Sequence, residues 1–338
     1  MMPAPLSLPQ SFRTLAALIC LSLVLGGCGY SDEMHQRQTL RKLLWHGKFV
    51  ELDQAIDQAY RERQKGKLSS NRLRGRFWEL QQTDGNFAAR FDAWVANRES
   101  AHAYLARGWY RLEQASKIRG DGPFRSIPAQ RVTAMRDLAL RGTEDMAQAL
   151  RKDPLCAMCV SGQIYANLLL GQTDPTLLDT AISLDPKLYQ PFVLHLVPLS
   201  PQWGGSDDAM TDFIDEMERR GIDRSILDRL QAQRLFQLGL IQQYDTRDFA
   251  GAREKYEQAI AHFPDSDALK NLAELYSAQG NHAKAASLLE KNLSENDEWD
   301  LYSIEALAQA YFADGRESDG NRMLRRRAEL YSRYRNGE

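Results

Sequence analysis

The sequence of 338 residues predicts an all-α protein, a solenoid built from antiparallel helix pairs. Apolar residues recur at spacings of three and four along most of the chain, and no run alternates with a period of two, so strands are not predicted. Three segments share the ending Ala-(Leu/Ile)-x-x-x-Pro, in which the proline closes a helix: Ala149–Pro154, Ala181–Pro186 and Ala259–Pro264. A helix ending that recurs along the chain indicates helical repeats.

Composition narrows the class of protein. Hydrophobic residues make up 43% and charged residues 26% of the chain, which is typical of a globular protein and not of a disordered or membrane-embedded one. The 43 Lys and Arg residues are balanced by 45 Asp and Glu residues, which leaves a net charge of -2. Because there is no basic excess, we expect no nucleic-acid partner.

Residues 1–27 have the organisation of a secretory signal peptide. Arg13 precedes an apolar stretch, Leu15 to Leu25, that is shorter than the roughly 20 residues of a membrane-spanning helix. The stretch ends in Leu25-Gly26-Gly27-Cys28, which resembles the bacterial lipobox, cleaved before its cysteine. The resemblance implies that Cys28 carries lipid, and several acyl chains make a stable membrane anchor. The alternative is an ordinary signal peptide with a chance cysteine.

The lipobox resemblance also implies where the mature chain resides. Gly29, and not Asp, follows the cysteine, which by the sorting rule of Gram-negative lipoproteins favours the outer membrane. We therefore expect a lipid-anchored protein of the bacterial cell envelope, on the outer membrane and facing the periplasm. Residues 28–39 are predicted to be a lipidated tether ahead of the first periodic helix.

The N-terminal half is predicted to be helical throughout. Periodic apolar residues indicate helices over Thr39–Trp45, Glu51–Arg63, Ala88–Val95, Ala101–Ile118 and Ala129–Leu150. Glycine and proline indicate the breaks, which fall at Gly47-Lys48, Gly66–Ser70, Gly120–Pro123 and Pro198–Ser206.

Several short motifs stand out in this half: Trp94-Val95, Leu105-Ala106-Arg107-Gly108-Trp109-Tyr110, Arg119-Gly120 and Trp203-Gly204-Gly205-Ser206-x-x-x-Met210. Together they resemble the bacterial family known as domain of unknown function 4034. The resemblance covers about residues 40–220, which we assign to this domain, and implies an all-helical, repeat-like structure with no established activity.

The corner Trp203-Gly204-Gly205-Ser206 has a structural explanation in the sequence. Prolines before it stop a helix, the glycines permit an unusual turn, and Ser206 followed by two aspartates is a good N-cap. We predict a structural corner, and the alternative is a ligand-binding one.

Cys156 and Cys159 form a CxxC and are the two cysteines left for other chemistry, because Cys20 lies in the signal peptide and Cys28 is predicted to carry lipid. Asp153-Pro154 predicts an N-cap and a first-turn proline, which would place both thiols at the start of a helix. No βαβ pattern surrounds them, and histidines are scattered singly, so neither a thioredoxin site nor a zinc site is favoured. We predict a structural disulfide, with a redox role or metal binding as alternatives.

Some arginines are candidates for anion binding. Arg107 and Arg119 could clamp a carboxylate or phosphate, or pair with a nearby acid. The C-terminal arginines could contact anionic lipid or glycan, or form a solvated helix face: Arg322, Arg325, Arg326, Arg327, Arg333 and Arg335.

The motif Leu272-Ala273-x-x-Tyr276-x-x-x-Gly280 returns 35 residues later as Leu307-Ala308-x-x-Tyr311-x-x-x-Gly315, close to the period of about 34 that is typical of tetratricopeptide repeats. Residues 221–338 therefore resemble tetratricopeptide repeats. A further copy contains Leu238-Gly239, Tyr256 and Pro264, with its first helix one residue out of register. We predict three repeats, with the last helix as a cap.

The resemblance implies a concave groove, lined by positions two, five, nine and twelve of each first helix. Carried onto this chain, these positions are Gln233, Phe236, Leu240, Gln243, Asp267, Lys270, Glu274, Ser277, Tyr302, Glu305, Gln309 and Phe312. Aromatic anchors among polar residues suit a peptide partner. The alternative is that Phe236, Leu240 and Phe312 are core residues in a shifted register.

The sequence lacks several common catalytic and nucleotide-binding motifs. It has no GxSxG elbow, HExxH, Walker loop or GxGxxG, so we predict neither an enzyme nor a cofactor nor a metal site. The predicted function is an envelope scaffold whose helical-repeat groove binds a protein or peptide. The alternative is a protein that binds or cleaves envelope glycan, with its carboxylates in a helical groove.

Overall fold

The computed structural model describes residues 30–81, 87–120, 127–296, 298 and 300–335. The predicted signal peptide, Cys28 and most of the break at Gly120–Pro123 lie outside these residues. Over the described ranges every regular element is a helix, which confirms the all-α prediction. None of these helices has both the length and the apolar character needed to cross a membrane.

Over the described residues, the N-terminal half contains the five predicted helices, the helix predicted to hold Cys156 and Cys159 at its start, the helix predicted to end before Pro186, and one helix that was not predicted. Its elements are α2 (Tyr30–Trp45), α3 (Phe49–Gln64), α4 (Ser70–Gln81), α5 (Ala88–Arg98), α6 (Ala101–Arg119), α7 (Ala129–Lys152), α8 (Ala157–Leu170) and α9 (Thr176–Leu184). Helix α4 escaped prediction because its arginines hide a short apolar stripe of Leu73, Phe77 and Leu80, all of which are buried.

The predicted tether is wrong over most of its length. Helix α2 begins at Tyr30 and not at Thr39, so residues 30–39 belong to a helix. A helix rises about 1.5 Å per residue, less than half the rise of an extended chain, so residues 30–39 span a shorter distance than the predicted tether would.

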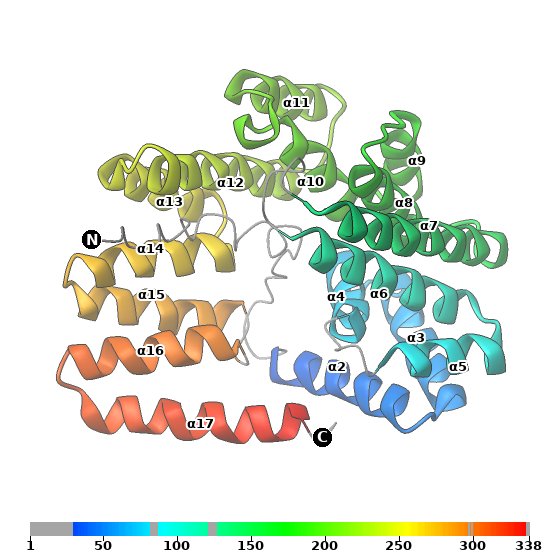
Figure 1. Cartoon of the computed structure of the whole chain (residues 1–338), viewed down its shortest axis with the longest axis horizontal. Helices are drawn as coiled ribbons and strands as arrows, with labels where there is room; N and C mark the ends of the chain where they lie inside the picture. The colour runs from blue at the N-terminus through cyan, green and yellow to red at the C-terminus, as the bar shows by residue number, and fades with distance from the viewer. Residues whose placement is uncertain (1–29, 82–86, 121–126, 297, 299, 336–338) are drawn as a thin grey trace.

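The second half repeats one arrangement, a helix followed by an antiparallel partner. A short connecting region comes first, with α10 (Gln190–Leu196), two 3₁₀ turns (Val197–Leu199 and Pro201–Trp203) and α11 (Asp207–Arg219). The repeats follow as α12 (Arg224–Leu240), α13 (Phe249–His262), α14 (Ser266–Ala278), α15 (His282–Glu295), α16 (Leu301–Ala313) and α17 (Glu317–Arg335). Figure 1 shows the helices turning around an arc that has α2 at one end and α17 at the other.

The apolar side chains form three clusters that follow one another along the chain. The first lies mainly in α2–α8, the second in α9–α12 and the third in α12–α17. Each helix therefore packs chiefly on its neighbours in sequence, as in other solenoid proteins.

Two tryptophans from the DUF4034-like sequence motifs lie buried in the first apolar cluster. The fully buried Trp94 donates its indole N–H to Asp53 Oδ1 of α3 at 3.1 Å. The fully buried Trp109 donates to the Met158 carbonyl of α8 at 3.2 Å. Because each indole finds an acceptor, these large rings can be buried without leaving a polar group unpaired.

The register shift in the first repeat has a structural cause. Between α12 and α13 the chain forms a π-helical turn, Ile241–Asp245. A π turn takes up one residue more than the α-helical turn it replaces. This extra residue matches the one-residue misregister between Gly239 and the second helix of that repeat.

Candidate functional site

A row of three side chains crosses the repeats on their first helices. Tyr244 ends the first of these helices, Glu274 lies on α14 and Tyr302 lies on α16. Burial and the nearby Glu274 carboxylate raise the pKa of both tyrosine hydroxyls, so the two phenols stay protonated at neutral pH. We call these three residues the groove row.

Lys270 lies beside the groove row and is already paired. Its ammonium group lies 2.9 Å from Asp267 Oδ1 and 3.8 Å from Asp300 Oδ2. Burial lowers the pKa of this ammonium, but the two carboxylates outweigh it and the pKa is raised. Lys270 therefore stays charged and is occupied by its own acids, which disfavours an anionic ligand here.

Glu274 presents its carboxyl group to solvent. Its side chain is exposed, but the surrounding protein still raises the pKa of the carboxyl group overall by desolvation, and the hydrogen bond with the Tyr244 hydroxyl lowers this pKa only in part. Among the described residues, no ion pair within 4.0 Å is recorded for this carboxylate. The groove row is thus a carboxylate flanked by two phenols.

The third repeat adds exposed aromatic surface. Tyr302 is 57% exposed and Phe312 is 39% exposed, and Gln309 between them is also exposed. Phe312 rests on Gly320, where a Cβ atom would come within 2.6 Å of its ring. Glu305 pairs with Arg327 of α17 at 3.0 Å.

In the first repeat the predicted groove residues are buried, and the groove prediction there is wrong. Phe236 and Leu240 belong to the third apolar cluster, as the alternative interpretation had it, while Gln243 accepts the Tyr256 hydroxyl at 2.7 Å. Gln233 is buried as well. The π turn shifts the register by one residue, so Tyr244 takes the place expected for Gln243. Counting backwards from the second helix of the repeat would have found this shift.

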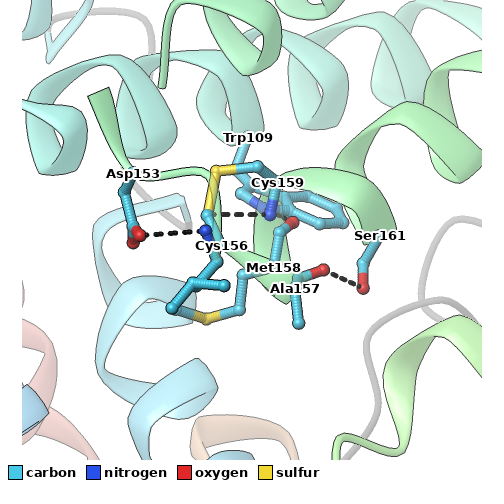
Figure 2. The surroundings of a disulfide bond; sticks show 8 residues. Trp109, Asp153, Cys156, Ala157, Met158, Cys159 and Ser161 are labelled. Atoms are coloured by element: carbon cyan, nitrogen blue, oxygen red, sulfur yellow. Dashed lines mark hydrogen bonds between the residues drawn. A yellow bond between two sulfur atoms is a disulfide. The ribbon is translucent and has the colours of Figure 1, made fainter. Parts of the chain in front are cut away.

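Cys156 and Cys159 are joined in a disulfide at the start of α8 (Figure 2). The predicted cap was wrong, because Asp153 is the C-cap of α7 and Cys156 is the N-cap of α8. Cys156 Sγ accepts the Cys159 backbone N–H at 3.1 Å, while Asp153 accepts the backbone N–H of Leu155 at 3.2 Å. Pro154 therefore lies in the turn between the helices and not in the first turn of α8.

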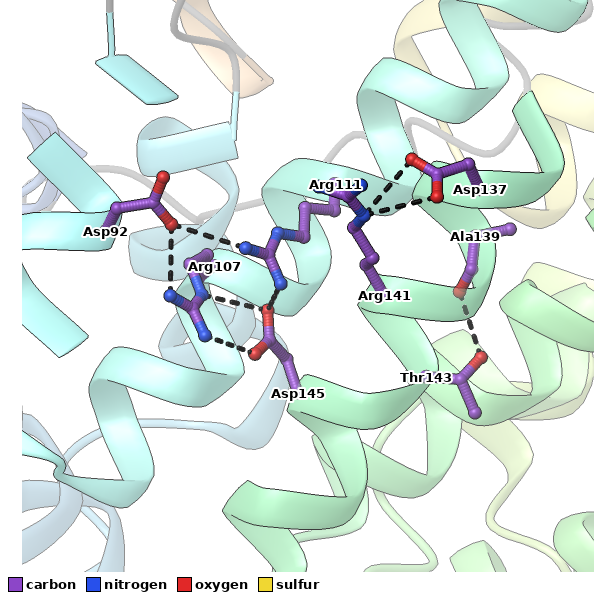
Figure 3. A network of polar contacts seen from close by, with 8 residues as sticks. All are labelled: Asp92, Arg107, Arg111, Asp137, Ala139, Arg141, Thr143 and Asp145. Carbon is purple, nitrogen blue, oxygen red and sulfur yellow. Dashed lines mark hydrogen bonds and ion pairs between the residues drawn. The ribbon is translucent and has the colours of Figure 1, made fainter. Parts of the chain in front are cut away.

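Arg107 is held by acids and is not a free clamp. It forms two hydrogen bonds with Asp145, at 3.1 and 2.7 Å, and a third with Asp92 at 3.0 Å. Arg111 bridges the same two acids (Figure 3). Burial raises the pKa of Asp145, and the two arginines lower it. This network joins α5, α6 and α7, as the alternative interpretation of Arg107 expected.

Arg119 packs on Trp203, the first residue of the predicted structural corner. Its guanidinium lies 4.9 Å from the ring centroid of Trp203 and donates to the Gly120 carbonyl at 2.7 Å. Gly205 has no space for a side chain, because a Cβ atom there would lie 2.1 Å from the Leu199 carbonyl oxygen. Gly204 has a φ of 90°, and Ser206 caps α11 by accepting the Ala209 N–H at 3.0 Å.

The C-terminal arginines are largely engaged with acids or carbonyls. Arg322 pairs with Asp319 at 2.8 Å, and Arg326 donates to the Glu298 carbonyl at 2.6 Å. Arg325 is exposed. The side chains of Arg333 and Arg335 lie outside the described part of the structure.

Comparison with known proteins gives the family context. The model of the domain of unknown function DUF4034 matches residues 36–183, and that of the tetratricopeptide repeat matches residues 243–306. The corner at Trp203–Ser206 lies beyond the first match. No curated protein matches the chain.

Solved structures of low identity are also similar to the chain. The crystal structure of MamA is 14% identical and covers 62% of this chain and 98% of its own, with a TM-score of 0.31. The APC/C hetero-tetramer Cut9-Hcn1 is 13% identical (83% and 50% covered, TM-score 0.34), and a monomeric IFIT1 mutant with Gppp-AAAA is 13% identical (85% and 79% covered, TM-score 0.35). The two family models thus match successive parts of the chain: a region similar to DUF4034 is followed by a region similar to the tetratricopeptide repeat.

Proposed function

We propose that this chain is a lipid-anchored scaffold of the bacterial envelope whose repeats bind an extended protein segment that bears a basic side chain. The observation that carries the proposal is the groove row, Tyr244, Glu274 and Tyr302, contributed by three successive first helices. A segment that lies across the repeats contacts all three side chains at once.

The charges around the groove row favour a cationic partner. Asp267 and Asp300 share one ammonium group, that of Lys270, and Glu274 adds a third carboxylate to the same surface. An arginine or lysine of the partner would pair with Glu274 and lie against the phenol rings of Tyr244 and Tyr302. Both contacts stabilise a cation, the first through a charge-assisted hydrogen bond and the second through the ring quadrupole.

Exposed aromatic rings supply the apolar part of the recognition. Tyr302 and Phe312 lie ten residues apart on α16, a distance of about 15 Å along the helix axis. An extended segment of about five residues spans that distance. Aromatic side chains that become buried on binding dominate the energy of most interfaces, so these two rings are the expected anchors.

Membrane anchoring rests on the lipobox resemblance at Cys28. Helix α2 begins at Tyr30, directly after Gly29, so the N-terminal helical domain would lie close to the membrane surface. Replacing Cys28 by Ala is expected to move the chain from the membrane fraction to the soluble fraction. A Cys28→Ala chain that still sediments with outer membrane would contradict the anchor and leave the groove proposal untouched.

The groove proposal is tested in two steps. A photo-crosslinking amino acid at Gln309 in living cells, followed by mass spectrometry, identifies the segment that lies on the groove. The segment is then synthesised, and its affinity for the purified chain is measured. We expect Glu274→Gln to weaken binding by roughly tenfold or more, because a charged hydrogen bond is lost.

A matched variant separates the groove from general charge effects. Glu254→Gln on α13 removes an exposed carboxylate from a second helix of the same repeats, and we expect it to leave the affinity unchanged. The proposal fails if the crosslinked segment has no basic residue, or if Glu274→Gln and Glu254→Gln bind it equally well.

A further inference from the structure

The Cys156–Cys159 disulfide closes a very short loop. The two cysteines are three residues apart and lie at the start of one helix, with their Cα atoms 5.3 Å apart. The entropic stabilisation from a disulfide grows with the length of the loop that it closes. A bond across three residues therefore constrains the unfolded chain little, and its main effect is local to α8.

The position of Cys156 favours a stable thiolate in the reduced protein. Cys156 is the N-cap of α8, and its Sγ already accepts the Cys159 backbone N–H at 3.1 Å (Figure 2). The same N–H and the positive end of the helix dipole would stabilise a negative charge on this sulfur. Stabilising the thiolate stabilises the reduced form, which makes the disulfide easier to reduce.

A small cleft borders Cys156, whose own surface is only 4% exposed. Cys156 is one of the residues that line it, together with Tyr60 and the guanidinium of Arg63. Arg63 is held there by Asp185, at 2.5 Å, and by Ser70, at 3.1 Å. Asp185 lines the same cleft, so Arg63 and Asp185 form an ion pair in its wall beside Cys156.

One exposed apolar residue, Leu155, lines the cleft next to Cys156. Leu155, the residue before Cys156, is 76% exposed, the largest exposure among the large hydrophobic residues described. Met158 and Leu188 also line the cleft. An exposed apolar rim beside a reactive sulfur suits a polypeptide substrate better than a small hydrophilic thiol.

We propose that Cys156 and Cys159 form a thiol–disulfide exchange site whose substrate is a polypeptide dithiol. A substrate thiolate attacks Cys156 Sγ, the Cys156–Cys159 bond breaks, and Cys159 leaves with the electron pair and takes up a proton. The second substrate thiol, after losing its proton, then attacks the mixed disulfide and releases Cys156 as a thiolate. The substrate is oxidised to a disulfide, and the pair is reduced to a dithiol. This site is independent of the groove row.

The first test measures how readily the disulfide opens. The full chain with Cys20→Ser and Cys28→Ser is equilibrated in glutathione buffers, alkylated and weighed by mass spectrometry. We expect millimolar glutathione to reduce the pair while circular dichroism shows that the helices stay intact. A pair that stays oxidised until the chain is unfolded overturns the proposal and leaves a structural crosslink.

The second test assigns the attacked sulfur. In the same background, Cys159→Ser leaves only Cys156 and Cys156→Ser leaves only Cys159, and each is mixed with a synthetic peptide disulfide. We expect the Cys156 thiol to form the mixed disulfide about tenfold faster or more, because it lines the cleft and caps the helix. Equal rates, or a faster Cys159, contradict the assignment.

The third test addresses the substrate class. Leu155→Asp changes an exposed rim residue of the oxidised pair without touching either cysteine. We expect it to slow oxidation of a reduced, unfolded polypeptide dithiol several-fold and to leave the reaction with dithiothreitol unchanged. If both reactions change equally, or neither does, the polypeptide is not the substrate that the rim selects.

Discussion

Glu113 is a fully buried acid on α6 whose charge state changes near neutral pH. Burial raises its pKa from 4.5 to about 7, although Arg74 and Lys117 lower it in part. Its Oε1 atom has no hydrogen-bond partner among the described residues. Arg74 itself is held over the Trp109 ring, 4.8 Å from its centroid, and donates to Gln190.

Unfolding free energy should therefore depend on pH through Glu113. Because the folded pKa is raised, the folded state binds the proton more tightly, and the stabilisation is complete below about pH 4.5. This stabilisation is lost as the pH rises to about 7, and the free energy of unfolding decreases by about 3 kcal/mol. Urea unfolding between pH 5 and 8 measures the slope. We expect Glu113→Gln, which stays neutral, to flatten it, and an unchanged slope would rule out Glu113 as its source.

The exposed rings of the third repeat should contribute little to stability. Tyr302 and Phe312 are 57% and 39% exposed, so the double change to Ala removes few buried contacts. We expect the melting temperature to stay nearly fixed while partner binding is lost. Phe236→Ala is the contrast, because its ring is 3% exposed and its loss should cost about 3–5 kcal/mol. An early melt of the double variant would place the two rings in the core.

At the scale of helices, the crossing of α6 and α7 depends on two glycines. A Cβ atom on Gly142 would lie 2.9 Å from Leu112 and 3.2 Å from the Gly108 carbonyl oxygen. Alanine normally favours a helix over glycine by about 1 kcal/mol. Here the added methyl has a backbone oxygen on one side and a packed leucine on the other, so the overpacking outweighs the helix propensity.

Gly142→Ala should accordingly destabilise the chain, by about 1–3 kcal/mol. Urea unfolding of the purified variant measures the change. Glu144→Ala, at an exposed position on the same helix, is the control and is expected to be close to neutral. A Gly142→Ala chain as stable as the control would show that α6 and α7 can separate without cost.

At the scale of the whole molecule, the order of the three apolar clusters predicts local unfolding. Helix α17 covers the last repeat with Met323 and Leu330, and the first cluster, which includes Trp94 and Trp109, lies in α2–α8. In a solenoid, stability is lost mainly next to the helix that is removed. Ending the chain at Asp314 should therefore deprotect α14–α16 in amide hydrogen exchange and leave α6 and α7 protected. Loss of protection at both ends would mean that the chain unfolds as one cooperative unit.

The sequence by itself determined the helical class, most helix positions and the order of the two domains, because helix periodicity, caps and repeat spacing are local properties of the chain. Regular spacing also placed the predicted positions of the second and third copies on α14 and α16, where the structure has them. Only the tertiary structure decided that Tyr244, and not Gln243, lies beside Glu274. A π turn rotates the residues that follow it about the helix axis, so each of them points in a different direction than an α-helix would give it. The tertiary structure likewise decided that Arg107 is held by Asp92 and Asp145, from 15 to 38 residues away. Such pairs depend on which helices cross, and no spacing along the sequence encodes that.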